Sequence, residues 1–290
     1  MSGTAYLQPD TLEELQALLP SLPEKTAVLA GGTDLMPKIR ARHPDYSCIL
    51  SLWKIPQLRT VEEQEGWLKI GAMVTHAAAA RDPRICRWFR GLSMACSHVG
   101  SQQIRNKGTL GGSLVNASPA GDIAPCVVLY HGEVELLGAS GTRCLTMDQF
   151  LSSDGRIDLK PGEILTAIWL PIDEALDSCF VKLGSRREVT IAQISLCAAW
   201  HTEDGKRTQI RAVAGAIDRR PCPFPSPQLL ADQTQAEEAA QGLAQKIQEI
   251  RLQRTRPPKL KLTPAEQLYK ERAAKGVVYD LLDAMEASNH

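Results

Sequence analysis

The stretch from Val99 to Cys126 constrains the fold of this chain more than any other part of the sequence. Its 28 residues hold five glycines, one Arg and one Asp, with almost no regular hydrophobic period. Ordering glycine costs backbone entropy, and glycine has no side chain whose packing could offset this cost. Clustered glycines therefore indicate that the backbone comes close to another group. We expect a loop in which Thr109–Ser113 presents successive bare N–H groups, a nest that binds anions such as phosphate. A long surface loop with turn glycines is the alternative.

A second glycine motif lies near the N-terminus. The apolar run Thr26–Ala30 predicts a short buried strand, and Gly31, Gly32 and Thr33 follow it directly. A strand that ends in this way offers a second backbone cradle, and two cradles suit one extended ligand with two phosphates between two lobes. Neither motif has the spacing G-x-G-x-x-G or G-x-x-x-x-G-K-[ST], which excludes a Rossmann or P-loop site.

Three segments carry a resemblance to a known family: Ala30–Leu35, Ile70–Ala72 and Ile104–Pro125. They resemble the FAD-binding medium subunits of the molybdenum hydroxylases, such as the flavin subunits or domains of xanthine dehydrogenase, carbon monoxide dehydrogenase and nicotinate dehydrogenase. The resemblance extends over nearly the whole chain and is looser in the C-terminal third. It implies an α+β fold with a two-lobed FAD-binding domain of the PCMH type. A C-terminal antiparallel sheet with helices, of the CO-dehydrogenase flavoprotein type, would follow.

The same resemblance implies a division of the chain and a function. Residues 1–173 are expected to form the FAD-binding domain, with lobes of about 1–55 and 56–173, and residues 174–290 the C-terminal domain. The chain is expected to be an oxidoreductase subunit that binds one FAD non-covalently. It would take electrons from the iron–sulfur clusters of a small partner subunit and pass them to NAD⁺ or another acceptor. Molybdenum–pterin would belong to a large partner subunit, giving a hetero-oligomer.

Two alternatives remain open at this stage. The chain could be a stand-alone FAD oxidoreductase with its own substrate pocket, or a scaffold of the same fold that has lost the flavin. The four intact cradle glycines, at 31, 32, 111 and 112, argue against the scaffold. No Ser-His-Asp set, paired carboxylates or H-E-x-x-H motif is present, which argues against a separate substrate site. We therefore assign no catalytic residue and expect a cofactor to supply the chemistry.

The expected cofactor-binding residues come mainly from the two glycine motifs. Gly31, Gly32, Gly111 and Gly112 are expected to cradle the pyrophosphate, with hydroxyl donors from Thr33 and Thr109. The first motif comprises Val28, Leu29, Ala30, Gly31, Gly32, Thr33, Asp34 and Leu35, and the second Thr109, Leu110, Gly111, Gly112 and Ser113. Asp34 could equally cap the helix expected at 35–42.

Three more residues are assigned by the resemblance. It implies that Asp122 binds the ribose on the adenosine side, that Leu165 contacts the flavin ring, and that Lys182 lies near the flavin. The residues themselves also fit plainer roles: a helix N-cap for Asp122, a core strand leucine for Leu165 and a solvated strand lysine for Lys182.

Other polar residues near the motifs are given structural roles. Arg105 and Asn106 either position the loop or contact phosphate, or Arg105 pairs with a carboxylate. His76 and His98 are interpreted as cap or surface residues.

Charge and cysteine usage exclude several classes of protein. The formal net charge is zero and the basic residues are scattered, which argues against nucleic acid or an anionic membrane as partner. No signal peptide or membrane-length apolar run is present, so we expect a cytoplasmic protein. The eight cysteines include no C-x-x-C pair, so we expect reduced thiols and neither an iron–sulfur cluster nor another metal site in this chain.

The remaining elements are predicted from periodicity and breakers. Thr11 is expected to cap a helix that ends at Pro20. Strands are expected at 48–52, 68–72, 127–130, 133–137, 142–145, 163–170, 179–183, 194–201 and 209–217, the last three as an antiparallel meander. Helices are expected at 35–42, 77–80, 84–99, 231–251 and 264–286. Pro221–Pro227 is expected to be an exposed linker.

Overall fold

The computed structural model describes residues 4–42, 44–186, 189–253 and 264–289. The chain forms two compact units that interleave along the sequence. The first comprises Met1–Ala79, Ser101–Ser118 and His131–Ile172, and the second Ala80–Gly100, Pro119–Tyr130 and Asp173–His290. The division expected from the sequence lies at a single point, after residue 173, whereas Ala80–Gly100 and Pro119–Tyr130 also belong to the second unit.

A small parallel sheet opens the first unit. Its strand order is β1-β3-β2, with β1 at Ala5–Leu7, β2 at Thr26–Leu29 and β3 at Cys48–Ser51. Thr11 caps helix α1 (Leu12–Leu18) as predicted. The Thr11 side chain accepts a hydrogen bond from Glu14 N–H at 3.1 Å. Helix α2 (Leu35–Arg42) also has the predicted bounds, and short 3₁₀ turns occupy Leu19–Ser21 and Pro56–Arg59.

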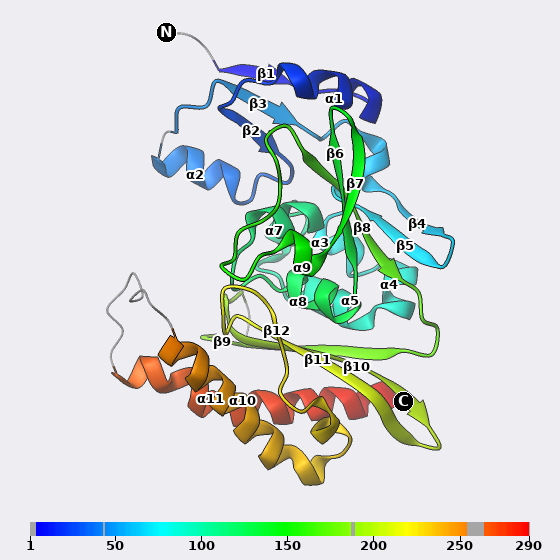
Figure 1. Ribbon diagram of the computed structural model, residues 1–290, viewed down its shortest axis with the longest axis vertical. Helices are drawn as coiled ribbons and strands as arrows, with labels where there is room; N and C mark the ends of the chain where they lie inside the picture. The colour runs from blue at the N-terminus through cyan, green and yellow to red at the C-terminus, as the bar shows by residue number, and fades with distance from the viewer. Residues whose placement is uncertain (1–3, 43, 187–188, 254–263, 290) are drawn as a thin grey trace. The chain divides into compact units, whose positions relative to one another are not determined.

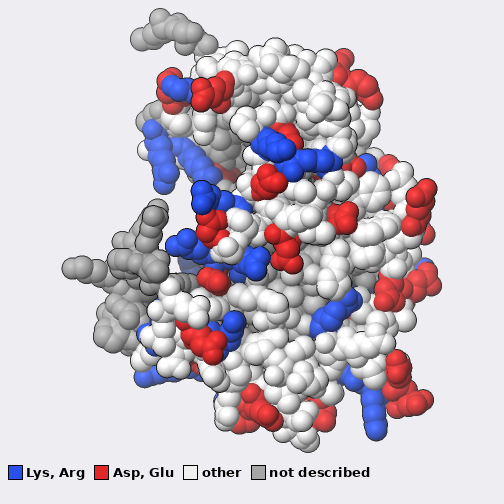
Figure 2. All heavy atoms as spheres, in the orientation of Figure 1, with Lys and Arg blue, Asp and Glu red and all other residues white. Residues whose placement is uncertain are grey.

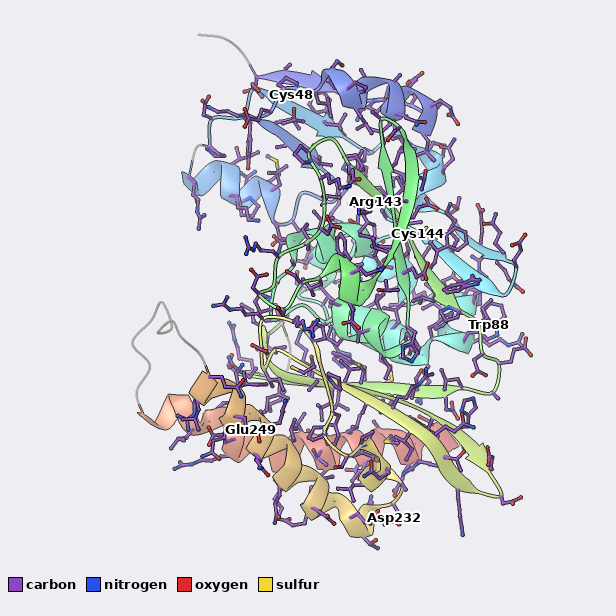
Figure 3. The ribbon with its side chains drawn as sticks, in the orientation of Figure 1. Cys48, Trp88, Arg143, Cys144, Asp232 and Glu249 are labelled. Carbon is purple, nitrogen blue, oxygen red and sulfur yellow. The ribbon has the colours of Figure 1, made fainter. Side chains whose placement is uncertain are left out.

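A five-stranded antiparallel sheet forms the rest of the first unit. Its order is β4-β5-β8-β6-β7, with bounds Val61–Gln64, Trp67–Gly71, Ile164–Pro171, Glu133–Gly138 and Gly141–Thr146. Short helices α3 (His76–Ala79), α6 (Gln102–Arg105), α7 (Leu110–Asn116) and α9 (Met147–Phe150) accompany it. Arg143 on β7 bonds the carboxylate of Glu163 at 2.8 Å and that of Asp158 at 3.1 Å, which ties the sheet to the loop before β8 (Figure 3).

The second unit is a four-stranded antiparallel sheet between two helical layers. The order is β12-β11-β10-β9, with bounds Cys222–Pro223, Lys206–Gly215, Ala192–Glu203 and Asp177–Gly184. Helices α5 (Arg90–Ser97) and α8 (Ile123–Leu129) pack on it, together with α4 (Pro83–Trp88) against α5. Helices α10 (Ala236–Gln253) and α11 (Pro264–Glu286) lie side by side below the sheet in Figure 1. Short 3₁₀ turns occupy Pro227–Leu230, Gln233–Gln235 and Ala287–Asn289.

The predicted meander is confirmed, and a tight hairpin turn joins its second and third strands. Strands β9, β10 and β11 pair antiparallel in sequence order. Asp204 and Gly205 have φ angles of 49° and 74°, so both turn residues are left-handed, as a two-residue hairpin between twisted strands requires.

Two predictions for the segment before residue 131 are wrong. The strand expected at 127–130 is the end of α8, because a short apolar run buries equally well as helix or strand. The expected loop over Val99–Cys126 contains α6, α7 and the start of α8. The side chains of Ser101 and Thr109 cap the first two helices, and in α7 the cap offsets the poor helix propensity of Gly111 and Gly112.

Three further predictions are corrected at element ends. The single helix expected at 84–99 breaks at Phe89, whose φ of −133° and ψ of 50° are not helical. The helix expected from 231 begins at Ala236, after a 3₁₀ turn capped by Asp232. The proline-rich segment is no simple exposed linker: Cys222–Pro223 pairs with β11 at the sheet edge, where Pro is tolerated, and Phe224 is buried.

The cysteines and the charged side chains are spread over both units. All eight cysteines are free thiols, and six are buried; Cys48 in β3 and the exposed Cys144 in β7 are labelled in Figure 3. Side chains of both charge signs occur throughout the face that Figure 2 shows. No helix within the described part of the chain has the length and apolarity needed to cross a bilayer.

Candidate functional site

The two glycine motifs are in direct contact within the first unit. A Cβ atom at Gly31 would lie 2.0 Å from the carbonyl oxygen of Lys107, which leaves no room for a side chain at residue 31. A Cβ at Gly112 would lie 3.7 Å from the Cβ of Ala30. The structure therefore brings together two motifs that are far apart in the sequence, as the two-cradle hypothesis requires.

The first motif presents unbonded backbone N–H groups. After β2 the chain turns through Gly32, whose φ of 74° strongly favours glycine. The carbonyls of Gly32 and Asp34 accept from Met36 and Lys38 N–H, at 3.0 and 3.2 Å, as α2 begins. The N–H groups of Gly31, Gly32, Thr33 and Asp34 have no acceptor among the described residues. Four successive free donors next to a helix N-terminus form an anion nest.

The second motif is a helix start whose N–H groups are already used. Those of Leu110, Gly111, Gly112 and Ser113 donate to Val74 O, Ala72 O, Thr109 Oγ1 and Thr109 O, at 3.0, 3.0, 3.1 and 2.9 Å. The prediction of bare N–H groups at 109–113 is thus wrong. A Cβ at Gly111 would lie 2.6 Å from the Cβ of Ala72, so this glycine allows α7 to pack on the end of β5.

Asp34 joins the two motifs through a side chain that sequence reasoning missed. Asn116, at the end of α7, donates from Nδ2 to Asp34 Oδ1 at 3.1 Å and accepts from Lys38 Nζ at 2.9 Å. The alternative of Asp34 as a helix cap is not found, because no N–H of α2 bonds its carboxylate in the described structure. An isolated Asn at a helix end gives no sequence signal for such a link.

Trp53 supports the same site and was also missed. Its indole N–H donates to the carbonyl oxygen of Ala30 at 2.7 Å, just before the nest. The ring carries two cations, with Lys107 Nζ and the Arg59 guanidinium each 4.7 Å from its centroid. Trp53 thus holds the first motif while the backbone of Lys107 holds the second against it.

His76 is buried beside these motifs. Its side chain is 3% exposed, so the interpretation as a surface residue is wrong. Burial, with a smaller effect from the charge of Arg105, lowers the pKa of His76 to about 4. The imidazole is therefore neutral at pH 7. Its Nδ1 is enclosed and has no hydrogen-bond partner in the described structure.

Asp122 and Lys182 form a buried ion pair in the second unit. Lys182 Nζ donates to Asp122 Oδ2 at 2.6 Å and to the carbonyl oxygen of His98 at 3.2 Å. Each side chain is 5% exposed, and Asp122 makes no capping bond to α8. The alternatives of a solvated lysine and a helix cap are both wrong. Burial raises the pKa of Asp122, and the Lys182 charge opposes this. Asp122 Oδ1 has no partner among the described residues.

Other predicted residues are strand residues whose apolar side chains make no polar contact. Leu165 is a buried residue of β8, opposite Leu136 on β6. Val28 is exposed on β2, and Leu29 pairs with Ser51 on β3. The residues at 28–35, 109–113 and 165 thus belong to the first unit, and Asp122 and Lys182 to the second.

Comparison with known proteins identifies the family. Residues 2–173 match the family described as the FAD binding domain in molybdopterin dehydrogenase. The chain belongs to this family. The resemblance inferred from the glycine motifs is therefore confirmed, and the protein is a flavoprotein component of a molybdenum-dependent oxidoreductase.

Curated relatives support this assignment along most of the chain. The nicotinate dehydrogenase FAD-subunit of Eubacterium barkeri is 33% identical over 230 residues, which cover 77% of this chain and 78% of the relative. The nicotine 6-hydroxylase medium subunit of Paenarthrobacter nicotinovorans is 32% identical over 215 residues, covering 74% and 75% of the two chains.

Solved structures show the fold. A chain of quinoline 2-oxidoreductase from Pseudomonas putida 86 superposes with a TM-score of 0.84 at 24% identity, covering 99% of both chains. A chain of carbon monoxide dehydrogenase from Hydrogenophaga pseudoflava gives a TM-score of 0.83 at 21% identity, covering 98% of both. The expected α+β fold of the CO-dehydrogenase flavoprotein type is confirmed.

Proposed function

We propose that this chain is the FAD-binding electron-transfer subunit of a heteromeric molybdenum hydroxylase. It takes electrons from the iron–sulfur clusters of a small partner subunit and delivers them to NAD⁺ or another acceptor. Molybdenum–pterin belongs to a large partner subunit, and the complex is cytoplasmic. The names of the relatives, an FAD-subunit and a medium subunit, support assembly with partner chains.

The observation that carries this proposal is the nest of four unbonded N–H groups at Gly31–Asp34, held against the second glycine motif. The pyrophosphate of FAD is a doubly charged anion, which such a nest stabilises through aligned N–H dipoles. The residues present therefore fit the cofactor. When bound, FAD supplies redox chemistry that accepts electrons singly or in pairs.

The proposal gives the chain's residues distinct roles. Two segments hold the pyrophosphate, Val28–Leu35 and Thr109–Ser113. The first binds it through its N–H groups, and the second packs against the first and fixes the position of the nest. Asp122 accepts from hydroxyls of the adenosine ribose through its unpartnered Oδ1. Leu165 would contact the flavin ring, and Lys182 would lie near the flavin. Residues 1–173 would be the FAD-binding domain, with lobes of about 1–55 and 56–173, and 174–290 the C-terminal domain.

Visible absorption of the purified chain, with mass identification of the released chromophore, tests the proposal. Wild type should show flavin bands and release FAD. Gly32→Val should abolish FAD binding, because a branched side chain at a φ of 74° distorts the nest.

Gly66→Val is the matched control, since Gly66 has a φ of 80° in the β4–β5 turn and open space around it. Both variants carry a comparable backbone strain of about 1–2 kcal/mol, but Gly66→Val should keep its flavin. A colourless wild-type protein that cannot take up added FAD would contradict the proposal.

A further inference from the structure

We propose that His76 is an additional ligand-binding residue of the phosphate site, where its Nε2–H donates a hydrogen bond to a phosphate oxygen held by the Gly31–Asp34 nest. The inference rests on the proposed function for the identity of the ligand, the pyrophosphate of FAD. His76 lies outside both glycine motifs, and its sequence context predicts only a cap or surface role.

The backbone places the His76 ring at the junction of the two motifs. His76 N–H donates to the carbonyl oxygen of Gly108 at 3.0 Å, and the preceding residue, Thr75, bridges to Thr109. A Cβ at Gly108 would lie 3.1 Å from His76 Cδ2 and 3.4 Å from Thr33 Oγ1. The imidazole edge and the hydroxyl of the nest residue therefore flank the same glycine.

The two ring nitrogens differ in their surroundings, and this decides which one carries the proton. Nδ1 is fully enclosed without a partner among the described residues, whereas Nε2 is not enclosed in this way. A buried N–H without an acceptor is costlier than a buried lone pair without a donor, so the proton belongs on Nε2. Nε2 is bonded to Cδ2, the ring atom that contacts Gly108, so this donor lies on the edge facing the motifs.

The electrostatic environment suits an anionic acceptor. Burial keeps the ring neutral at pH 7, so the ring acts as a directed N–H donor. The positive charge of Arg105 acts on the same ring and adds attraction for an anion. A neutral N–H that donates to a phosphate oxygen forms a charge-assisted bond, stronger than one between two neutral groups.

Replacing His76 by Asn or by Gln distinguishes a role in ligand binding from a role in packing, because the two amide side chains differ in length. The side-chain nitrogen of Gln reaches the position of imidazole Nε2, whereas that of Asn reaches only the position of Nδ1. We expect His76→Asn to raise the dissociation constants of FAD and of ADP by about 10- to 100-fold in the full-length apoprotein, as loss of a bond to a charged group does. His76→Gln should stay within about threefold of wild type.

A phosphorus NMR spectrum of bound FAD gives a readout that a packing role would not move. His76→Asn should shift the pyrophosphate resonances while the visible flavin spectrum keeps its wild-type shape. Equal weakening by Asn and Gln, or unchanged affinity and phosphorus shifts in both, would overturn the inference and leave the proposed function standing. A wild-type chain that binds neither FAD nor ADP would overturn both.

Discussion

At the scale of single residues, each of the two compact units holds a buried ionisable side chain among the candidate residues. The Asp122–Lys182 pair has lost nearly all contact with water, and the attraction between its charges offsets only part of the desolvation cost. One carboxylate oxygen of the pair, Asp122 Oδ1, has no partner among the described residues. Buried polar atoms are normally satisfied, so this oxygen is available to accept a hydrogen bond from a ligand.

The His76 imidazole should make stability depend on pH in a defined window. Its pKa is about 4 in the folded chain against 6.5 as its ordinary value. Between these values the unfolded chain binds more protons, so stability rises with pH from about 4 to 6.5 and this contribution is then complete. The difference amounts to about 3 kcal/mol, at 1.36 kcal/mol per pH unit.

Urea unfolding of wild type and His76→Gln at a series of pH values checks this prediction. The free energy of unfolding of wild type should fall relative to the variant by about 3 kcal/mol as the pH decreases from 7 to 4. Comparing the two proteins cancels the titration of all other groups. A constant difference across this range would mean that the imidazole is not buried neutral.

At the scale of elements, two helical glycines differ in whether a neighbouring segment contacts them. Gly111, in α7, faces the backbone of Ala72, and a Cβ would come within 2.9 Å of its carbonyl oxygen. Gly276, in α11, is exposed, and a Cβ there would meet no neighbouring atom. The first glycine is required by packing and the second only weakens its helix.

The same substitution should therefore have opposite effects in these two helices. Gly111→Ala should destabilise the protein by about 1–3 kcal/mol, because the added methyl group overpacks the contact with β5. Gly276→Ala should stabilise it by about 0.5–1 kcal/mol through helix propensity. Chemical denaturation of both variants measures the two signs, and a stabilised Gly111→Ala protein would refute the close approach of α7 and β5.

At the scale of the whole molecule, the family match and the compact units do not coincide. The match covers residues 2–173, yet Ala80–Gly100 and Pro119–Tyr130 belong to the second unit. Within that unit α5 packs on β9 and α8 packs on β10 and β11, all of which come from beyond residue 173. Buried residues of these helices, such as Leu92 and Val127, depend on that sheet.

A fragment of residues 1–173 should therefore not fold to a stable soluble domain on its own. Without β9–β11 the apolar faces of α5 and α8 would be exposed, and such patches cause association. Expression of the fragment beside the full chain, followed by gel filtration and thermal unfolding, tests this. A monomeric fragment with a cooperative transition would show that the first 173 residues have a complete core.

The sequence alone determined the family, the cofactor class and most regular elements, because these depend on local signals. The glycine motif after a buried strand, the Thr11 cap and the meander with its Asp-Gly turn are each readable within a few residues. Only the tertiary structure decided which N–H groups are free. The first N–H groups of α7 donate to Val74, Ala72 and Thr109, whereas those of Gly31–Asp34 stay open in the described structure. The tertiary structure also buried His76, paired Asp122 with Lys182 and bonded Trp53 to Ala30, since burial and partners come from chain segments that no local pattern connects.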